Sequence, residues 1–592
     1  MHVQEHTEAP GGHVGRPGHG CACGDQKNRR HQATGAHLRH LRARRWMEDT
    51  GRFALTAAGP SPKATTSGKP SPRDWKRRRS AAPRRTGPQH PEEGDLTMAD
   101  RPNVLLITAD HMRRDAIGCN GADFVQTPNL DRLAARGVTF ANSCTPNPIC
   151  VPGRASITTG NYSHRATGTK NNGGRIHDDQ PKIAQHFADA GYQTTAIGKL
   201  HYVPYSPPGE PRLLHGFQHA ELCEEGRIIA SFDPTGQTQG LEDYHDWLYQ
   251  TGWGGYERAH AIGNNDVHAA ASPLPEEFHE EAWVATRAIA NMDNHLQGDS
   301  DAPFFMWASF TKPHAPYDPP RPWDAMYDPR EIPPPIGDYD LLCDRDPMYR
   351  QWPVAYGWDR MSPEAIQNSR AHYFGLVSFQ DANIGRMLSY LEDAGELDNT
   401  IVVYSADHGD LLGDFRCFFK CNMFQGSVGV PLIVAGPGVA AQGSVDALAG
   451  LQDILPTVAD LSGNPLDQDV MGESLQGVLN GSEESVRDMY ISQSLEAPNQ
   501  RYMVRTLRFK YVYHELGGVE ELYDVQADPQ ELENLAADRT EVTLEMRGTL
   551  IDWVRENGDD AMLDDAGDLV TSDEALAECD CFNAGRMGWR WY

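Results

Sequence analysis

The sequence has no long hydrophobic run. A membrane helix needs about 18 consecutive apolar residues, and no apolar run in the 592 residues comes near that length. We therefore expect a soluble protein with no membrane partner. The beginning of the chain also lacks the apolar segment of a secretory signal, and its 11 cysteines show no disulfide framework, which makes the cytoplasm the expected location. Hydrophobic residues still make up 39% of the chain, enough for a sizeable core, and this excludes a wholly disordered protein.

Positive charge is scarce except at the beginning of the chain. The sequence has 53 Lys and Arg against 83 Asp and Glu, a net charge of -30. Residues 1–97 contain 18 Lys and Arg against 9 Asp and Glu, so they carry +9, and residues 98–592 carry -39. A body this acidic opposes a nucleic-acid partner, because phosphate binding needs positive charge. Among the functions that we consider, nucleic-acid binding through the basic leader is therefore the one that the sequence supports least.

The basic leader has no pattern of regular structure. Residues 1–97 are rich in Gly, Pro, Arg, Ser and His, and their apolar residues are too sparse to offset the entropy of ordering the chain. We expect this segment to be disordered and to come from a misassigned start, with Met98 as the true first residue. A solvated tail and a functional basic arm around the run of four basic residues at 76–79 are the alternatives. The sequence does not show whether residues 1–97 are expressed.

From Met98 onward, apolar runs of strand length alternate with helical patterns. Uninterrupted apolar runs are typical of strands buried on both faces of a parallel sheet, and the alternation predicts an α/β fold. We expect a mixed, mostly parallel sheet sandwiched by helices. The predicted strands are 104–108, 194–197, 304–310, 401–405 and 432–435, and the predicted helices are 128–136, 181–190 and 374–391.

Two regions break this rhythm. Residues 203–300 mix Gly, Trp, His and acidic residues, and we interpret them as an insertion that shapes a substrate site. After about residue 480, alternation with a period of two at 502–506 and 510–513 precedes a helical pattern at 540–555. The predicted organisation is a catalytic α/β domain at 98–480 and a small antiparallel α+β subdomain with an acidic tail at 481–592.

Charged side chains follow two of the predicted strands directly. Asp110 and His111 come after the first strand, and Asp407 and His408 come after the strand at 401–405. Because the carboxyl ends of parallel strands meet at one edge of a sheet, the two pairs are expected to lie close together. Carboxylate oxygens and imidazole nitrogens are ligands for a divalent cation, so the pattern predicts a metal site. Taken singly, an Asp at the end of a strand is more often a helix cap or a turn former than a metal ligand.

A further segment lies between these pairs. Cys150-Val-Pro-Gly-Arg154, which continues to Thr159-Gly160, resembles the C-x-P-x-R…T-G signature of type I sulfatases, members of the alkaline-phosphatase superfamily. Other segments resemble sulfatase blocks in their usual order, through nearly all of residues 101–555. These segments are 101–110, 127–134, 198–201, 312–316, 407–410, Lys420 with 430–434, and 521–524 with 534–535. The resemblance implies the alkaline-phosphatase-like fold.

The resemblance also implies a chemistry. It implies that a formylglycine-generating enzyme oxidises Cys150 to formylglycine, whose hydrate carries two hydroxyls on one carbon, one to attack and one to expel the bound anion. The implied roles are Arg154 to orient the hydrate, Lys199 and Lys420 to bind the anion, His201 to help break the hemiacetal, His314 near the leaving-group oxygen, and Asp110, His111, Asp407 and His408 to hold one divalent metal ion.

The chain departs from the common sulfatase pattern at two predicted ligands. His111 stands where many sulfatases have a second Asp, and His408 where many have Asn. The resemblance implies Ca²⁺, but two imidazoles make a softer site, for which Mn²⁺ and Zn²⁺ are also suitable. His408 is similar to the arrangement in bacterial phosphonate monoester hydrolases and in some bacterial sulfatases, which leaves phosphorus substrates open.

The predicted function is hydrolysis of sulfate esters, with a small anionic ester as substrate. The first alternative is a phosphonate monoester or phosphodiester hydrolase with the same nucleophile. A more distant alternative is a non-catalytic binding protein on the same fold, although loss of Cys150, Arg154 or the acidic ligands would then be expected and all are present. The natural substrate and the oligomeric state are not legible in the sequence.

Overall fold

The structure is a computed structural model, which describes residues 101–203, 210–224 and 239–573. The basic leader and the end of the acidic tail lie outside these residues, so the predictions for residues 1–97 and for Met98 as the first residue stay predictions. No helix in the described part of the chain is long and apolar enough to cross a membrane.

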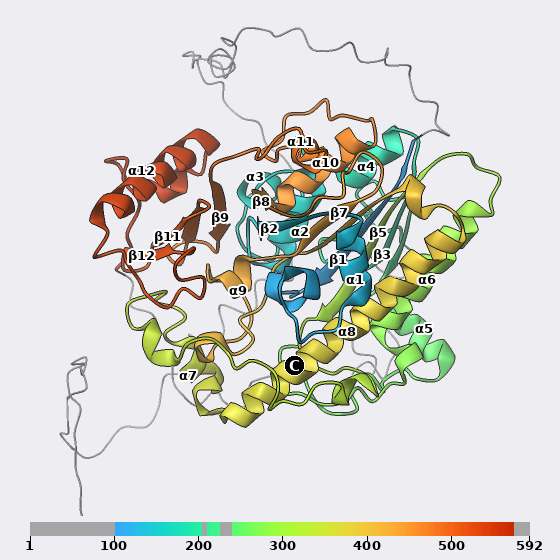
Figure 1. Ribbon diagram of the computed structural model, residues 1–592, viewed down its shortest axis with the longest axis horizontal. Coiled ribbons are helices and arrows are strands. Elements are labelled where there is room, and N and C mark those ends of the chain that lie inside the picture. The colour runs from blue at the N-terminus through green and yellow to red at the C-terminus, as the bar shows by residue number, and fades with distance from the viewer. Residues whose placement is uncertain (1–100, 204–209, 225–238, 574–592) are drawn as a thin grey trace, which may run out of the picture. The chain divides into compact units, whose positions relative to one another are not determined.

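The main element is an eight-stranded sheet with the strand order β4-β3-β5-β1-β6-β7-β2-β8 (Figure 1). Only β7 runs antiparallel to its neighbours, and all other pairs in this sheet are parallel. Every residue of β1, β5 and β6 is buried, as the uninterrupted apolar runs predict. The strands are β1 (Asn103–Asp110), β2 (Gly137–Cys144), β3 (Gln193–Gly198), β4 (His219–Leu222), β5 (Phe304–Pro313), β6 (Thr400–Ala406), β7 (Leu432–Ala435) and β8 (Gly443–Gly450).

Two groups of helices pack with this sheet, which confirms the predicted fold class. Figure 1 shows α6 and α8 side by side, and both contact β5. A second group is formed by α2 with α4 and α10. The first group comprises α1 (Pro128–Ala135), α6 (Glu280–Leu296) and α8 (Pro363–Asp393), and the second α2 (Cys150–Thr159), α4 (Ile183–Asp189) and α10 (Ile454–Leu461). The predicted insertion at 203–300 includes β4, α5 (Asp243–Thr251) and α6, so its last part belongs to the helical layer on the sheet.

Helix α8 begins eleven residues before the predicted start at 374. The Ser362 hydroxyl accepts a hydrogen bond from the Ala365 N–H, and Pro363 occupies the first helical turn. Both features favour a helix start, because the serine satisfies a free N–H and proline has no N–H to leave unsatisfied. The segment Ser362-Pro-Glu is therefore the sequence signal for the start of α8, and it precedes the residues with clear apolar periodicity.

A second sheet near the C-terminus is antiparallel throughout, as predicted. Its order is β12-β11-β10-β9, formed by β9 (Tyr490–Ser494), β10 (Arg501–Arg505), β11 (Phe509–His514) and β12 (Val519–Asp524). Alternate residues face opposite ways. Tyr502 and Val504 pack in a cluster with α12 (Thr540–Asn557), whereas Met503 packs in a cluster with Cys144 and Leu448 of the main sheet. Both faces of this small sheet are therefore buried, one of them against the large domain.

Candidate active site

The predicted ligands meet at the carboxyl edge of the main sheet. Asp110 ends β1, and Asp407 and His408 directly follow β6. The two strands are parallel neighbours with Ala109 opposite Ala406, which brings the two Asp-His pairs side by side. Cys150 begins α2 and completes the group. All of these side chains are buried, Cys150 with 2% of its surface exposed.

Four side chains form a cluster that is compact enough to hold a metal ion. One ligand atom from each of Asp110, His111, Cys150 and His408 lies within 4.8 Å of the others. His408 Nε2 is 3.2 Å from Cys150 Sγ and 3.6 Å from Asp110 Oδ1, and His111 Nε2 is 3.8 Å from the same oxygen. Three of the four predicted metal ligands, together with the predicted nucleophile, therefore converge on one point.

Hydrogen bonds fix both imidazoles in the form that binds a metal. His408 Nδ1 lies 2.9 Å from the Gly409 carbonyl oxygen, which only accepts, so the proton is on Nδ1 and Nε2 carries a lone pair. His111 Nδ1 lies 2.6 Å from Asp410 Oδ2 in the equivalent arrangement. Burial lowers the pKa of His408, and burial followed by the charge of Lys420 lowers that of His111 well below its usual range, so both rings are neutral. Such anchoring of the distal nitrogen is typical of metal-ligating histidines.

The fourth predicted ligand, Asp407, lies at the side of the cluster. Its Oδ2 accepts a hydrogen bond from Arg154 Nε at 2.8 Å, and its Oδ1 accepts the His408 N–H at 2.9 Å. Oδ1 nevertheless lies 3.6 Å from His408 Nε2 and so faces the same centre. Burial, with the nearby charge of Asp110, raises the pKa of Asp407 to about 6. Both oxygens are thus engaged within the chain, and Arg154 supplies the balancing charge.

Arg154 joins three elements behind the cluster. Its side chain is completely buried, and beyond Asp407 it donates to Ser309 Oγ at 2.7 Å and to the Lys199 carbonyl at 2.6 Å. Ser309 lies within β5 and Lys199 directly follows β3, so one guanidinium links α2 to two strands of the main sheet. The planar fork of Arg makes several such bonds at once, which Lys cannot do.

Two ammonium groups face the cluster. Lys199 Nζ forms an ion pair with Asp110 Oδ2, and Lys420 Nζ contacts His111 Nε2. Burial alone raises the pKa of Asp110, but the positive charge of Lys199 holds it well below its usual range. A carboxylate kept ionised between cations is suited to a metal, and two ammonium groups beside it are suited to an anionic substrate group.

The two predicted proton-transfer histidines lie on loops that follow strands. The His314 ring is buried, with its centroid 4.0 Å from that of His111, and its Nδ1 donates to the Ala315 carbonyl at 2.7 Å. Burial and then Lys420 lower the pKa of His314 well below its usual range, so the ring is neutral. His201 follows Lys199 by two residues, and its backbone N–H donates to Glu224 at 2.9 Å. The structure brings His314 to the cluster, and the role of His201 stays a prediction.

The sequence argument missed residues that orient the predicted ones. Asp410 bonds His111 and also accepts the N–H groups of Leu412 and Phe419, at 2.7 and 2.9 Å. Arg113 donates to the Asp410 carbonyl at 3.1 Å and so fixes the loop that follows β6. Asp410 closes the Asp-His-Gly-Asp segment, and that spacing was the available signal.

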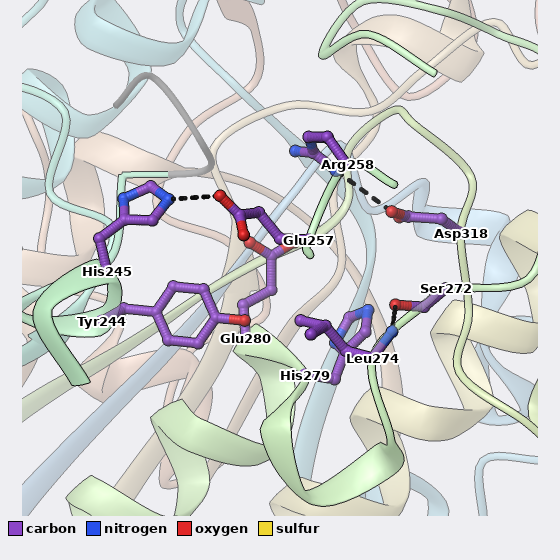
Figure 2. A pocket seen from close by; sticks show the side chains of 9 residues that line it. All are labelled: Tyr244, His245, Glu257, Arg258, Ser272, Leu274, His279, Glu280 and Asp318. Carbon is purple, nitrogen blue, oxygen red and sulfur yellow. Dashed lines mark hydrogen bonds and ion pairs between the residues drawn. The ribbon is translucent and has the colours of Figure 1, made fainter. Parts of the chain in front are cut away.

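The predicted insertion forms a polar pocket beside the His314 loop. Figure 2 shows the Glu257 carboxylate directed toward His245, and Arg258 directed toward Asp318. Asp318 lies four residues after His314, and Lys312 at the other end of this loop pairs with it at 2.8 Å. Residues of the insertion thus meet the loop that carries a predicted active-site residue. The lining residues are Tyr244, His245, Glu257, Arg258, Ser272, Leu274, His279, Glu280 and Asp318.

Known proteins are similar to this chain in sequence and in fold. The family model Sulfatase matches residues 102–464, and the model N-sulphoglucosamine sulphohydrolase, C-terminal, matches residues 413–556. The chain is 31% identical over 453 residues to an arylsulfatase of Clostridium perfringens, covering 74% of this chain and 90% of the relative. It is 32% identical over 446 residues to a choline-sulfatase of Rhizobium meliloti, covering 74% and 82%. The solved phosphonate monoester hydrolase of Agrobacterium radiobacter is 25% identical with a TM-score of 0.64, over 77% of this chain and 96% of that one.

Proposed function

Because this chain belongs to the sulfatase family and hydrolyses sulfate esters, we propose that it does so through a formylglycine made from Cys150 and with one divalent metal ion. The observation that carries this proposal is the convergence of Cys150 with Asp110, His111 and His408 in one buried cluster. A formylglycine-generating enzyme is then the required maturation partner. A thiol at this position would attack once and remain trapped as a covalent ester, whereas the aldehyde hydrate regenerates.

The converted Cys150 supplies the nucleophile. Its hydrate offers one hydroxyl to attack sulfur, as the bond from sulfur to the alcohol oxygen breaks, and a second hydroxyl whose deprotonation releases sulfate and restores the aldehyde. Lys199 and Lys420 bind the sulfate oxygens, and Arg154 orients the hydrate. The neutral His314 imidazole accepts the proton of the attacking hydroxyl at Nε2 and gives it to the alcohol oxygen, and His201 accepts the proton of the second hydroxyl.

The metal would be held by Asp110, His111 and His408, with Asp407 beside them. Neutral imidazoles with inward lone pairs and an ionised carboxylate fit a divalent cation. A bound metal ion polarises the sulfate oxygens and favours the ionised nucleophile. Ca²⁺ is the ion of the family resemblance, and the two imidazoles favour Mn²⁺ or Zn²⁺.

Removal of the metal tests this ligand set. We expect a chelator to lower activity by more than about 100-fold, and readdition of one ion per chain to restore it. Saturating metal, at about 1,000 times its dissociation constant, is expected to add about 4 kcal/mol to the free energy of unfolding. Activity assays combined with elemental analysis measure the loss and recovery of activity per bound ion, and thermal unfolding measures the gain in stability. The matched variant His111→Asp exchanges an imidazole for a carboxylate and is expected to shift the preference toward Ca²⁺. Full activity of a chain shown to be metal-free would contradict the proposal.

A matched substrate series tests sulfate against phosphorus esters. The alternative is favoured by one observation, the similarity to a phosphonate monoester hydrolase that covers 77% of the chain. With an aryl sulfate, an aryl phosphonate monoester and an aryl phosphodiester that share one leaving group, we expect kcat/KM to be highest for the sulfate. The expected margin exceeds about tenfold, or about 1.4 kcal/mol of transition-state stabilisation. A phosphonate preferred by that margin would establish the alternative instead. Inactivity toward all three, with metal and formylglycine confirmed, would contradict both.

A further inference from the structure

The loop that carries Lys420 has an unfavourable backbone conformation on both sides of the lysine. Phe419 has a φ of 67° and Cys421 a φ of 75°, in the left-handed region that residues with a Cβ rarely adopt. Such a conformation persists only where surrounding contacts impose it, and it is often found where a side chain must be aimed. The contacts that impose it here identify the residues on which the direction of Lys420 depends.

The large domain holds one side of this loop. The Phe419 N–H donates to Asp410 Oδ1 at 2.9 Å, and the Phe419 carbonyl accepts the Leu411 N–H at 2.8 Å. The Cys421 N–H donates to the Pro148 carbonyl at 3.1 Å. These bonds fix the N–H groups of both left-handed residues but leave the carbonyls of Lys420 and Cys421 to other partners.

The C-terminal sheet and a neighbouring turn hold these two carbonyls. Arg501, the first residue of β10, donates from Nη1 to the Cys421 carbonyl at 2.7 Å. The same Nη1 pairs with Asp346 Oδ2, and Asp346 Oδ1 accepts the Tyr349 N–H at 3.3 Å. The Tyr349 hydroxyl donates to the Lys420 carbonyl. Arg501 thus holds one carbonyl directly and supports the residue that holds the other.

Because the ion pair between Arg501 and Asp346 is buried, neither side chain can readily move to another partner. Arg501 is 2% exposed and Asp346 1% exposed, so neither charge is solvated and each depends on the other. We propose that Arg501, which lies outside the cluster of catalytic and ligand residues, is a positioning residue for Lys420, and that the C-terminal sheet thereby sets the affinity for the sulfate group. This inference rests on the proposed role of Lys420 in binding that group.

A double-mutant cycle separates positioning from a merely structural role. In the mature full-length enzyme, Lys420→Ala is expected to raise KM for an aryl sulfate and to weaken inhibition by inorganic sulfate. Arg501→Gln is expected to do the same, by about tenfold. In the Lys420→Ala background, Arg501→Gln should change neither quantity by more than about twofold, because the group that it positions is gone.

Two further variants keep the test decisive. Arg505→Gln removes a buried arginine from the other end of β10, where it bonds Asn142 and Thr506, and is expected to leave KM and sulfate inhibition unchanged. Tyr349→Phe removes one hydroxyl without leaving a buried charge unpaired, so it can be measured even if Arg501→Gln unfolds. We expect it to raise KM by a smaller factor, and this rise should disappear in the Lys420→Ala background.

The outcomes distinguish the inference from the proposal beneath it. One outcome is that Lys420→Ala raises KM while Arg501→Gln and Tyr349→Phe still raise KM by their full factors in the Lys420→Ala background. In that case Arg501 does not act through Lys420, and the inference is overturned while the proposed role of Lys420 stands. If Lys420→Ala changes neither KM nor sulfate inhibition, the role proposed for Lys420 is wrong and the inference falls with it.

Discussion

Cys150→Ala is expected to lower kcat for an aryl sulfate by at least about 10⁴-fold, because it removes the proposed nucleophile, on which both halves of the reaction would depend. Lys199 and Lys420, the groups proposed to bind sulfate, should stay in place, since Lys199 pairs with Asp110 and Lys420 contacts His111. Inorganic sulfate should therefore still inhibit or bind with little change. Steady-state kinetics together with calorimetric titration of sulfate measures the two effects separately.

A second variant at the same position distinguishes the hydrate from an ordinary alcohol. Cys150→Ser carries one hydroxyl, so it is expected to release about one equivalent of the alcohol per chain and then to stop as a sulfated serine, visible by mass spectrometry. In the unaltered protein, the peptide that contains residue 150 should carry formylglycine when it is prepared from the native host. Active enzyme in which this peptide holds only cysteine would refute the proposed nucleophile.

Arg154→Met is expected to lower the free energy of unfolding by about 3–5 kcal/mol, which is the usual cost of removing one partner from a buried ion pair. Arg154 is completely buried and lies 2.8 Å from Asp407 and 3.8 Å from Asp110, so both carboxylates lose their nearest guanidinium. The same change releases the bonds to Ser309 and the Lys199 carbonyl, and we expect turnover to fall by more than about 100-fold. Denaturant unfolding and kcat measure the two losses.

Two matched variants show which property of Arg154 matters. Arg154→Lys keeps the charge but not the fork, so it is expected to recover part of the stability and little of the activity. Adding Asp407→Asn to Arg154→Met removes the unpaired charge and should likewise recover stability without activity. A loss of less than about 1 kcal/mol in Arg154→Met would mean that water or a neighbouring group solvates Asp407, against the burial described here.

The fold and the centre of the site were legible in the sequence because both follow from local patterns. Uninterrupted apolar runs predicted β1 and β6. Because residues at the carboxyl ends of parallel strands lie at one edge of the sheet, Asp110 and Asp407 were predicted to lie close together. The edge strand β8 was not predicted, since its first half is polar and partly exposed. The sulfatase blocks then assigned roles that no single Asp-His pair could carry.

The orienting residues were not legible, for a physical reason. Asp410 and His111 are 299 positions apart, and Arg501 and Asp346 are 155 apart. Which buried acid faces which base depends on rotamers and on how two sheets dock, and neither leaves a period or a motif in the chain. Asp407 shows the same limit, because its place beside strand β1 was predicted while its pairing with Arg154 was not.

The burial of Cys150 has a consequence for the synthesis of the enzyme. With 2% of its surface exposed, the thiol is out of reach of another protein once the chain has folded, so the proposed oxidation to formylglycine would have to precede folding. Residue 150 is synthesised long before the C-terminal sheet that packs on the large domain, because the 374 residues from there to Asp524, the end of β12, take roughly 20–75 s at about 5–20 residues per second. On the proposed maturation, the active fraction of each preparation would be set by the relative rates of oxidation and folding during that interval, and it could not be raised in the finished protein.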